Sequence, residues 1–434
     1  MSVFFGTDGI RGIAGRDLTA EVAYRCGRSL GLLAKNMKVV IGTDTRVSNS
    51  YLVNSLSAGL MECGADVVFV GIIPTAGISY LTKELNFNYG VAITASHNPK
   101  EYNGIKIFSS KGEKLSEFEE LQIEKNIIKT NVSEVFRLGS FTYDKSLVKK
   151  YKKHLLDVGG ALEGMKIVID GANGAGYKLA PDIFKELGAR VYKFCCQNKG
   201  DEINNNCGAL YPKNLAKKVL KLNADFGFCY DGDSDRLIAV DEKGEIVDGD
   251  LLLCGLAKRM KQRNKLKNNA VVGTSQTNMG IELELKKNGI DFYRADVGDK
   301  YVLELMKKNN LSLGGEQSGH IIISEYMPTG DGILASILVA SMCKKENIKL
   351  GEFAKVDLFP QENINVVVKD KIRVLGSEIL ADAVSNVQQE LSGRGRVLVR
   401  ASGTEPKIRI MVESDSQTKC ESLAKYLKQV VELI

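Results

Sequence analysis

A pattern of short apolar runs separated by helix-length stretches occurs three times along this 434-residue chain. The three copies are Val39–Gly42, Tyr51–Cys63 and Ala65–Val70; Lys166–Asp170, a stretch to Leu187 and Ala189–Tyr192; and Ala270–Gly273, Met279–Lys287 and Ile290–Tyr293. Continuous apolar strands separated by helices are typical of βαβ units, in which parallel strands are buried in one sheet. Because crossovers are right-handed, the two strands of each copy should lie side by side. The pattern predicts three α/β domains.

Each copy is followed by a further strand that ends in a polar loop. Tyr89–Ile93 runs into Thr94–Pro99, Asp225–Tyr230 runs into Asp231–Arg236, and Leu311–Leu313 runs into Gly314–His320. Ligands of open α/β sheets bind outside the carboxyl ends of strands. If the three domains face one cleft, the three loops should contribute to a single site.

The end of the chain has a different pattern. Asn363–Val368 and Val397–Val399 are expected strands, and Cys420–Val431 is an expected amphipathic helix. The fold class predicted is three similar α/β domains with mixed, mainly parallel sheets plus a smaller C-terminal α+β domain around one central cleft. The expected domains are residues 1–150 (serine loop), 151–250 (metal loop), 251–362 (sugar loop) and 363–434 (phosphate loop).

Composition and charge exclude several classes of protein. With 44% hydrophobic and 26% charged residues, the chain has enough apolar surface to fold, which excludes wholesale disorder. The net charge of +6 is small and the basic residues are interleaved with acidic ones, so no nucleic-acid partner is expected. The longest apolar run, Gly332–Cys343, is too short to span a bilayer and predicts a buried helix. Nine scattered cysteines and an N-terminus without a basic start favour a soluble, cytoplasmic protein with reduced thiols and no membrane partner.

The aspartate loop has the composition of a divalent-metal site. Asp231, Asp233 and Asp235 alternate with small residues, and three carboxylates this close repel one another without a cation. Hard oxygen ligands suit Mg²⁺ or Ca²⁺. An EF-hand is excluded because Arg236 stands where its sharp turn needs glycine and because strands flank the loop. A solvated acidic turn is the remaining alternative.

The serine loop offers a hydroxyl directly after an apolar strand. Ser96 could carry a phosphate if the aspartate loop supplies a cation, and an ordinary turn serine is the alternative. His97 is adjacent to Ser96, but neighbours in sequence seldom align for proton transfer, and no GxSxG motif is present. The segment Asn103–Lys106 returns an amine, Lys106, toward the same strand end.

Two further loops have the composition of ligand-binding sites. Gly314–His320 offers a carboxylate, an amide, a hydroxyl and an imidazole, which suits a polyol, although His320 could also be a structural histidine. Arg400–Arg409 combines two guanidinium groups, hydroxyls and glycine-exposed amides, which suits a phosphate. Gly171–Gly176 has neither P-loop nor GxGxxG spacing and is interpreted as a strand–helix turn.

Five of these segments together resemble the α-D-phosphohexomutase superfamily. They are Phe5–Gly12, Thr94–Phe108, Asp231–Arg236, Gly314–His320 and Arg400–Arg409, and the resemblance covers nearly the whole chain. Within the superfamily the chain is most similar to the bacterial phosphoglucosamine mutases, as shown by Phe5–Gly12, by Ala95 before the serine and by Gln317 in the sugar loop.

The resemblance implies a role for each matching residue. Ser96 would be a phosphoserine, and its phosphate would hold one Mg²⁺ per subunit together with Asp231, Asp233 and Asp235. Candidate catalytic residues besides Ser96 are Arg11 on the transferring phosphoryl group, Lys106 and His320 as general base and acid, His97 and Arg236. Candidate substrate-binding residues are Glu316 and Ser318 for sugar hydroxyls, and Arg400, Ser402, Gly403, Thr404 and Arg409 for the non-reacting phosphate.

The implied activity is the interconversion of glucosamine 6-phosphate and glucosamine 1-phosphate through a 1,6-bisphosphate intermediate, supplying amino-sugar nucleotide and cell-wall precursor synthesis. The partner is then a small-molecule sugar phosphate, and the fourth domain is expected to close over it to exclude water. The alternatives are the same chemistry on mannose or glucose phosphates, a non-catalytic sugar-phosphate sensor, and a phosphatase. The sequence leaves the oligomeric state open, with a homodimer through apolar helix faces as one alternative.

Overall fold

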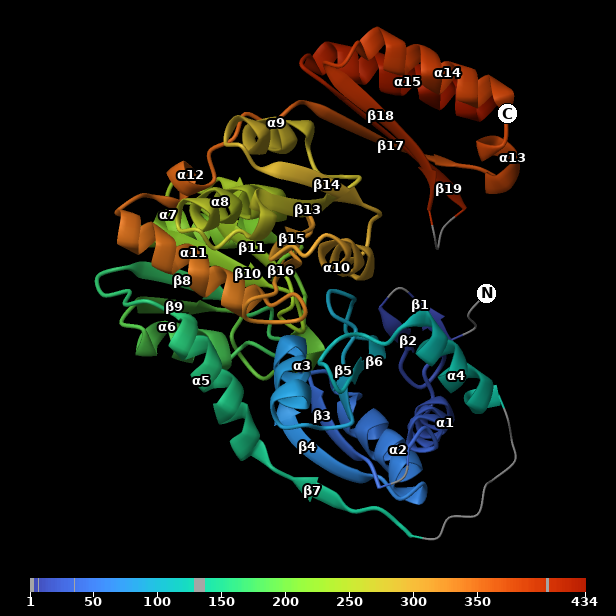
Figure 1. The fold of residues 1–434 in the computed structure, drawn as a ribbon, viewed down its shortest axis with the longest axis vertical. Helices are drawn as coiled ribbons and strands as arrows, with labels where there is room; N and C mark the ends of the chain where they lie inside the picture. The colour runs from blue at the N-terminus through green and yellow to red at the C-terminus, as the bar shows by residue number, and fades with distance from the viewer. Residues whose placement is uncertain (1–3, 7, 35, 129–136, 403–405) are drawn as a thin grey trace. The chain divides into compact units, whose positions relative to one another are not determined.

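The computed structural model describes residues 4–6, 8–34, 36–128, 137–402 and 406–434 (Figure 1). Two compact units can be distinguished by their internal contacts. The larger comprises residues 1–276 and 290–355, and the smaller comprises residues 277–289 and 356–434.

The larger unit contains three sheets with the same central strand order. The seven-stranded sheet runs β1-β2-β6-β5-β3-β4-β7, the five-stranded sheet β12-β11-β10-β8-β9, and the four-stranded sheet β14-β13-β15-β16. In each, the first strand of the repeat lies between the second and third strands, parallel to both, and the next strand pairs antiparallel with the third. The predicted repeat and the fold class are confirmed.

The first sheet belongs to the N-terminal part of the chain. Its strands are β1 (Phe5–Gly6), β2 (Gly9–Ile13), β3 (Lys38–Thr43), β4 (Asp66–Ile72), β5 (Tyr89–Ile93), β6 (Tyr102–Ser109) and β7 (Phe141–Tyr143). Its helices are α1 (Ala20–Gly31), α2 (Asn49–Glu62), α3 (Thr75–Glu84) and α4 (Glu117–Ile128). Helices α1 and α2 can pack closely because Gly27 has no side chain. A Cβ at this position would lie only 2.1 Å from the Leu56 carbonyl oxygen. Of the strands in this sheet, β1, β2, β6 and β7 were not predicted. β1, β2 and β7 have only two to five residues, with glycines or isolated aromatics, and carry no periodic signal.

The second and third sheets complete the larger unit. Their strands are β8 (Lys166–Asp170), β9 (Arg190–Phe194), β10 (Phe226–Tyr230), β11 (Leu237–Val240), β12 (Ile246–Val247), β13 (Ala270–Thr274), β14 (Asp291–Ala295), β15 (Leu313–Gly315) and β16 (Ile321–Ile323). The helices are α5 (Val148–Val158), α6 (Leu179–Glu186), α7 (Pro212–Leu222), α8 (Gly249–Gln262), α10 (Asp299–Lys308), α11 (Gly332–Glu346) and α12 (Leu350–Phe353). The expected strand Leu311–Leu313 is shifted, because Gly314 and Gly315 pair with Ile322 and Ile321 and so extend the strand into the predicted loop.

Helix α11 confirms the predicted buried helix. Most of its residues are buried, and Asp331 caps its N-terminus by accepting a hydrogen bond from the Leu334 amide at 3.0 Å. Within the described part of the chain, every helix is too short or too polar to traverse a lipid bilayer.

The smaller unit is built on an antiparallel sheet with the order β17-β19-β18. Its elements are β17 (Gln361–Val367), β18 (Gly395–Ala401), β19 (Lys407–Ser414), α9 (Met279–Lys287), α13 (Lys371–Leu375), α14 (Glu378–Leu391) and α15 (Gln417–Leu433). Helices α14 and α15 bury Leu380, Val387 and Leu427 in a core that also contains Ile408 and Ile410. The predicted strands and helix at the end of the chain are confirmed. β18 and α15 extend beyond the expected ranges at both ends, and β17 starts earlier and ends one residue before Val368.

Candidate active site

The three polar loops of the larger unit meet at one site. The serine loop follows β5, the aspartate loop joins β10 to β11, and the sugar loop joins β15 to β16, so all three leave equivalent strands (Figure 1). The Ser96 hydroxyl donates a hydrogen bond to Asp231 Oδ2 at 2.5 Å. His320 Nδ1 lies 3.7 Å from Asp235 Oδ2. The shared strand order therefore brings together side chains that are far apart in the sequence.

Ser96 is held in an unusual backbone conformation. Its φ of +51° lies in the left-handed region, which a non-glycine residue adopts at some cost in energy. Its amide N–H donates to Thr94 Oγ1 at 3.0 Å, and its carbonyl oxygen accepts from Asn204 Nδ2 at 2.8 Å. A Cβ at Gly232 would lie 2.5 Å from the same carbonyl oxygen, so the aspartate loop can approach only with glycine there. The surroundings fix the serine against the carboxylates.

Arg46, which sequence reasoning missed, holds the serine loop in place through hydrogen bonds to its backbone. Its side chain is fully buried and pairs with the equally buried Asp44 through Nε–Oδ2 at 2.9 Å. The remaining guanidinium nitrogens donate to the carbonyl oxygens of Ser96, Asn98, Pro99 and Tyr102. Sequence alone shows Asp44 and Arg46 only as polar residues at a strand end, a weak signal shared by many loops.

The aspartate loop fits a divalent cation. One oxygen from each of Asp231, Asp233 and Asp235 lies within 4.8 Å of the others, and all three residues are buried. Among the described residues, Asp233 Oδ1 and Asp235 Oδ1 have no hydrogen-bond partner. Buried carboxylate oxygens without donors are costly, and a hard cation such as Mg²⁺ would satisfy them. Burial raises the pKa of Asp231 well above its ordinary value, and the neighbouring carboxylates add to the shift.

Lys106 places its ammonium group among the carboxylates. It lies on β6 opposite Ala92 of β5, and its Nζ is 2.8 Å from Asp233 Oδ2 and 3.2 Å from Asp235 Oδ2. Burial alone would lower the pKa of Lys106, but the surrounding carboxylates raise it well above its ordinary value. Burial alone would raise the pKa of Asp235, but Lys106 and His320 together hold the pKa of that carboxyl well below its usual range. The predicted proximity of Lys106 to the serine and metal loops is observed.

Arg11 reaches the site from β2 and is accompanied by residues that sequence reasoning missed. Its guanidinium pairs with Asp8, which also contacts Lys106 at 3.0 Å and Lys114. Asp299, at the start of α10, pairs in turn with Lys114 at 2.5 Å. Asp8 lies in the motif Phe5–Gly12, and this motif could have identified it as a site residue. Lys114 and Asp299 lie in no recognisable motif.

The two histidines of the site differ in charge. Burial lowers the pKa of His97 to about 4, with Arg236 and Arg11 contributing, so this ring is neutral at pH 7. Burial would also lower the pKa of His320, but Asp299 and Asp235 raise it to about 9, so this ring is protonated. The Gly330 amide faces His320 Nε2 at 3.2 Å, a hydrogen bond that requires a neutral ring. Because two carboxylates flank the imidazole, the protonated form prevails.

The sugar loop lines a cavity of about 460 Å³, a size typical of small-molecule sites. The cavity is lined by Asp8, Asp235, Arg236, Thr274, Gln276, Val297, Gly298, Asp299, Glu316, Gln317, Ser318 and His320. Glu316 Oε1 accepts a hydrogen bond from the Gly298 amide at 2.9 Å, and burial raises the pKa of Glu316. The predicted sugar-binding residues Glu316 and Ser318 therefore share one cavity with charged residues of the metal loop.

The predicted phosphate-binding residues lie in the smaller unit. Arg400 of β18 pairs in register with Arg409 of β19, and Arg409 donates to Ser402 Oγ at 3.4 Å. Burial and the charge of Arg409 lower the pKa of Arg400. Like charges opposite each other in a sheet are unfavourable unless an anion binds them. Gly403 and Thr404 lie outside the described residues.

Comparison with protein families assigns the chain to a class of enzyme. The four domains of the phosphoglucomutase/phosphomannomutase family match the chain in sequence order. Alpha/beta/alpha domain I matches residues 2–133, domain II residues 148–244, domain III residues 248–359 and the C-terminal domain residues 364–430. The chain belongs to this family, within the α-D-phosphohexomutase superfamily. The resemblance inferred from the five sequence motifs is confirmed.

Individual relatives indicate which subfamily the chain resembles. Proteins named phosphoglucosamine mutase from Thermoanaerobacter sp. (strain X514) and Clostridioides difficile (strain 630) are 44% and 42% identical to the chain, over 100% of it and 99% of their own length. Among solved structures, a phosphoglucomutase/phosphomannomutase family protein from Burkholderia thailandensis matches with a TM-score of 0.84 at 23% identity, covering 100% of this chain and 97% of its own. Aspergillus fumigatus N-acetylphosphoglucosamine mutase, in complex with GlcNAc-6P and magnesium, matches with a TM-score of 0.71 at 19% identity, covering 99% and 96%. The two structures support the fold, and the two sequence relatives support the subfamily.

Proposed function

We propose that the chain is an isomerase that interconverts glucosamine 6-phosphate and glucosamine 1-phosphate through a phosphoserine at Ser96. The observation that carries the proposal is the buried Ser96 hydroxyl, 2.5 Å from the first carboxylate of a three-aspartate cluster. The full-length relatives named phosphoglucosamine mutase support the choice of substrate. Glucosamine 1,6-bisphosphate is the intermediate that this exchange requires.

One Mg²⁺ per chain would be held by Asp231, Asp233, Asp235 and the phosphate of Ser96. When bound, the ion neutralises charge on the transferring phosphoryl group. The fit rests on the three hard, buried oxygen donors and on the two carboxylate oxygens without partners among the described residues.

The remaining residues position the transfer and move one proton. The phosphoryl group passes from Ser96 Oγ to a sugar hydroxyl, the P–Oγ bond breaks as the new P–O bond forms, and the hydroxyl proton leaves to a base. Arg11 stands beside Asp8 and would balance negative charge on the phosphoryl oxygens. The protonated Lys106 and His320 would donate to oxygens that gain charge, and each would act as base only after losing its proton. The assignment of acid and base therefore stays a prediction.

The sugar loop and the phosphate loop would supply the contacts to the substrate. Glu316 and Ser318 would bind sugar hydroxyls from the wall of the 460 Å³ cavity. Arg400, Ser402 and Arg409 would bind the phosphate that does not react, and their clustered positive charge supports this role. A small-molecule sugar phosphate is the partner this arrangement serves.

Intact mass and turnover together test the proposal. The mass of the isolated protein should include about 80 Da from a phosphoryl group on Ser96. This phosphoryl group should exchange with that of glucosamine 1-phosphate. Ser96→Ala should abolish both the modification and isomerisation, whereas the matched variant Ser422→Ala, at an exposed site on α15, should retain both. Isomerisation by Ser96→Ala would refute the phosphoserine.

Substrate comparison tests the second half of the proposal. Glucosamine 1-phosphate should be turned over faster than glucose 1-phosphate or mannose 1-phosphate. A preference for either hexose phosphate would refute the substrate assignment while leaving the phosphoserine intact. Stoichiometric release of inorganic phosphate would instead indicate a phosphatase, and binding without turnover would indicate a sensor.

A further inference from the structure

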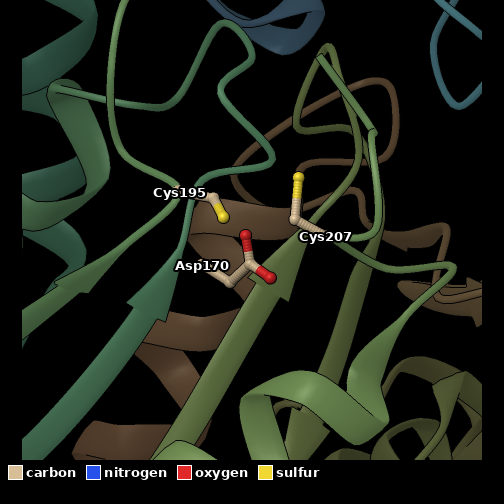
Figure 2. A group of neighbouring side chains, drawn as sticks. All are labelled: Asp170, Cys195 and Cys207. Atoms are coloured by element: carbon tan, nitrogen blue, oxygen red, sulfur yellow. The ribbon is translucent and has the colours of Figure 1, made fainter. Parts of the chain in front are cut away.

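A second group of possible metal ligands lies in the second α/β domain, apart from the aspartate loop. Asp170 ends β8, Cys195 follows β9, and Cys207 lies in the loop before α7. One carboxylate oxygen and the two sulfur atoms all lie within 4.8 Å of one another. Figure 2 shows Asp170 at the end of its strand, with the two cysteines on the loops beside it. Neither the phosphoryl transfer nor the sugar cavity uses these residues.

Asp170 is a buried carboxylate with no basic partner among the described residues. Its side chain is inaccessible to solvent. Oδ1 accepts a hydrogen bond from the Ala172 amide at 2.9 Å, and Oδ2 accepts one from the Gly208 amide at 2.7 Å. These two bonds fix the orientation of the carboxylate and leave further lone pairs, but they supply no counter-charge. A cation bound here would balance the buried charge.

The backbone around the two cysteines places both sulfur atoms close to the carboxylate. Cys195 has a φ of +44°, a left-handed conformation that costs energy for a residue with a Cβ. Its carbonyl oxygen accepts from the Asn173 amide at 2.6 Å, which helps to hold this conformation. Gly208, with a φ of +74°, turns the chain directly after Cys207 and donates its amide to Asp170. The three ligand atoms therefore lie close together before any ion arrives.

We propose that Asp170, Cys195 and Cys207 form a binding site for one Zn²⁺ ion. Two thiolates and one carboxylate match the ligands that Zn²⁺ accepts, whereas Mg²⁺ and Ca²⁺ prefer oxygen alone. Binding deprotonates both thiols, so two protons leave as two Zn–S bonds form, and no oxidant or reductant is needed. Three protein ligands leave a fourth position for water, and Cys195 is partly exposed while Cys207 is buried.

The proposed site also bears on the serine loop through the segment between its two cysteines. Asn204 lies in that segment, and its Nδ2 donates to the carbonyl oxygens of Ser96 at 2.8 Å and Asn98 at 3.0 Å. An ion that ties both ends of the segment to β8 restricts its motion. Zinc should therefore stabilise the folded protein against unfolding, because it binds the native state in preference to the unfolded chain.

Cobalt substitution in the full-length protein tests the site. Reduced, metal-free protein is titrated with Co²⁺ in the presence of excess Mg²⁺, which competes for the aspartate loop. Coordination by thiolate gives an intense near-ultraviolet charge-transfer band that carboxylate ligands cannot produce. We expect one equivalent of Co²⁺ to develop the band, and one equivalent of Zn²⁺ to remove it and raise the melting temperature.

Matched cysteine variants locate the ligands. Cys195→Ser and Cys207→Ser should each weaken the band and lower Zn²⁺ affinity at least about tenfold, because each removes a metal–sulfur bond. Cys196→Ser is the control, since the Cys196 thiol instead donates to the carbonyl oxygens of Phe194 at 3.2 Å and Ile169 at 3.4 Å. A missing band in the wild type, or a band unchanged in both ligand variants, would overturn the site. Loss of two thiols to a disulfide between residues 195 and 207 with no metal uptake would also overturn it, in favour of a redox pair.

Discussion

Removing the guanidinium of Arg46 should destabilise the first α/β domain and disorganise the serine loop. In Arg46→Met, the buried carboxylate of Asp44 loses its only ionic partner among the described residues, although Thr94 Oγ1 and Asn49 Nδ2 still donate to it at 2.7 and 3.0 Å. Four loop carbonyl oxygens also lose a donor.

The expected cost can be built from these contacts. Breaking a buried ion pair by removing one partner costs about 3–5 kcal/mol. The carbonyl oxygens add less, because those of Ser96 and Asn98 still accept from Asn204 Nδ2 and that of Pro99 from the Tyr102 amide. We therefore expect a loss of about 3–5 kcal/mol, which is a large share of the total stability of many domains. The double variant Asp44→Asn/Arg46→Met should recover part of the loss, because it removes the uncompensated charge.

Urea unfolding followed by circular dichroism, together with the phosphate content of Ser96, measures both effects. Arg16→Met is the matched control, because Arg16 and its partner Asp17 form an exposed ion pair that should leave the unfolding midpoint unchanged. If Arg46→Met folds too poorly to measure, Arg46→Lys keeps the charge but loses the multiple donors and should be intermediate. A shift below about 1 kcal/mol for Arg46→Met would refute the argument that the guanidinium supports this loop.

Two further perturbations probe other parts of the larger unit. Gly330→Ala would place a Cβ 2.3 Å from His320 Nε2, so the imidazole must move, and steady-state assays should show turnover reduced about 10- to 100-fold with Ser96 still phosphorylated; unchanged turnover would contradict a catalytic position for His320. Burial raises the pKa of Asp331 from 3.8 to about 6, so its ionisation penalises the folded state as the pH rises through that interval. Relative to Asp331→Asn, the wild type should lose about 2 kcal/mol of stability between pH 4 and pH 7 in urea unfolding, and a constant difference would show that the carboxyl is not perturbed.

The repeated fold was predictable because its strands carry a strong local signal. Runs such as Lys166–Asp170 are continuous and β-branched, and the helices between them fix a parallel arrangement. The limits of elements were less predictable where glycines take part in pairing. Gly314 and Gly315 were expected in a loop, yet their backbone groups extend β15 because the antiparallel partner β16 lies beside them. The end of β15 is set by pairing with β16, and the two glycines themselves gave no sequence signal for a strand.

The candidate site likewise contains residues that the sequence predicted and residues that it did not. Ser96 and the three aspartates were found because each lies at a strand end with a composition that chemistry explains. Arg46, Lys114 and Asp299 were missed because their importance depends on partners far away in the sequence, such as the carbonyl oxygens that Arg46 binds or the Asp8 carboxylate that Lys114 binds. A single charged residue has no periodicity, so only the folded structure identifies its partner.

The separation of the charged groups along the chain has a consequence for protein synthesis. Asp8 and Lys106 leave the ribosome early, the carboxylates of Asp233 and Asp235 follow later, and His320 emerges last. A nascent or truncated chain that ends before the second domain would present Ser96 without Asp231, Asp233 and Asp235. Incomplete products should consequently lack isomerase activity.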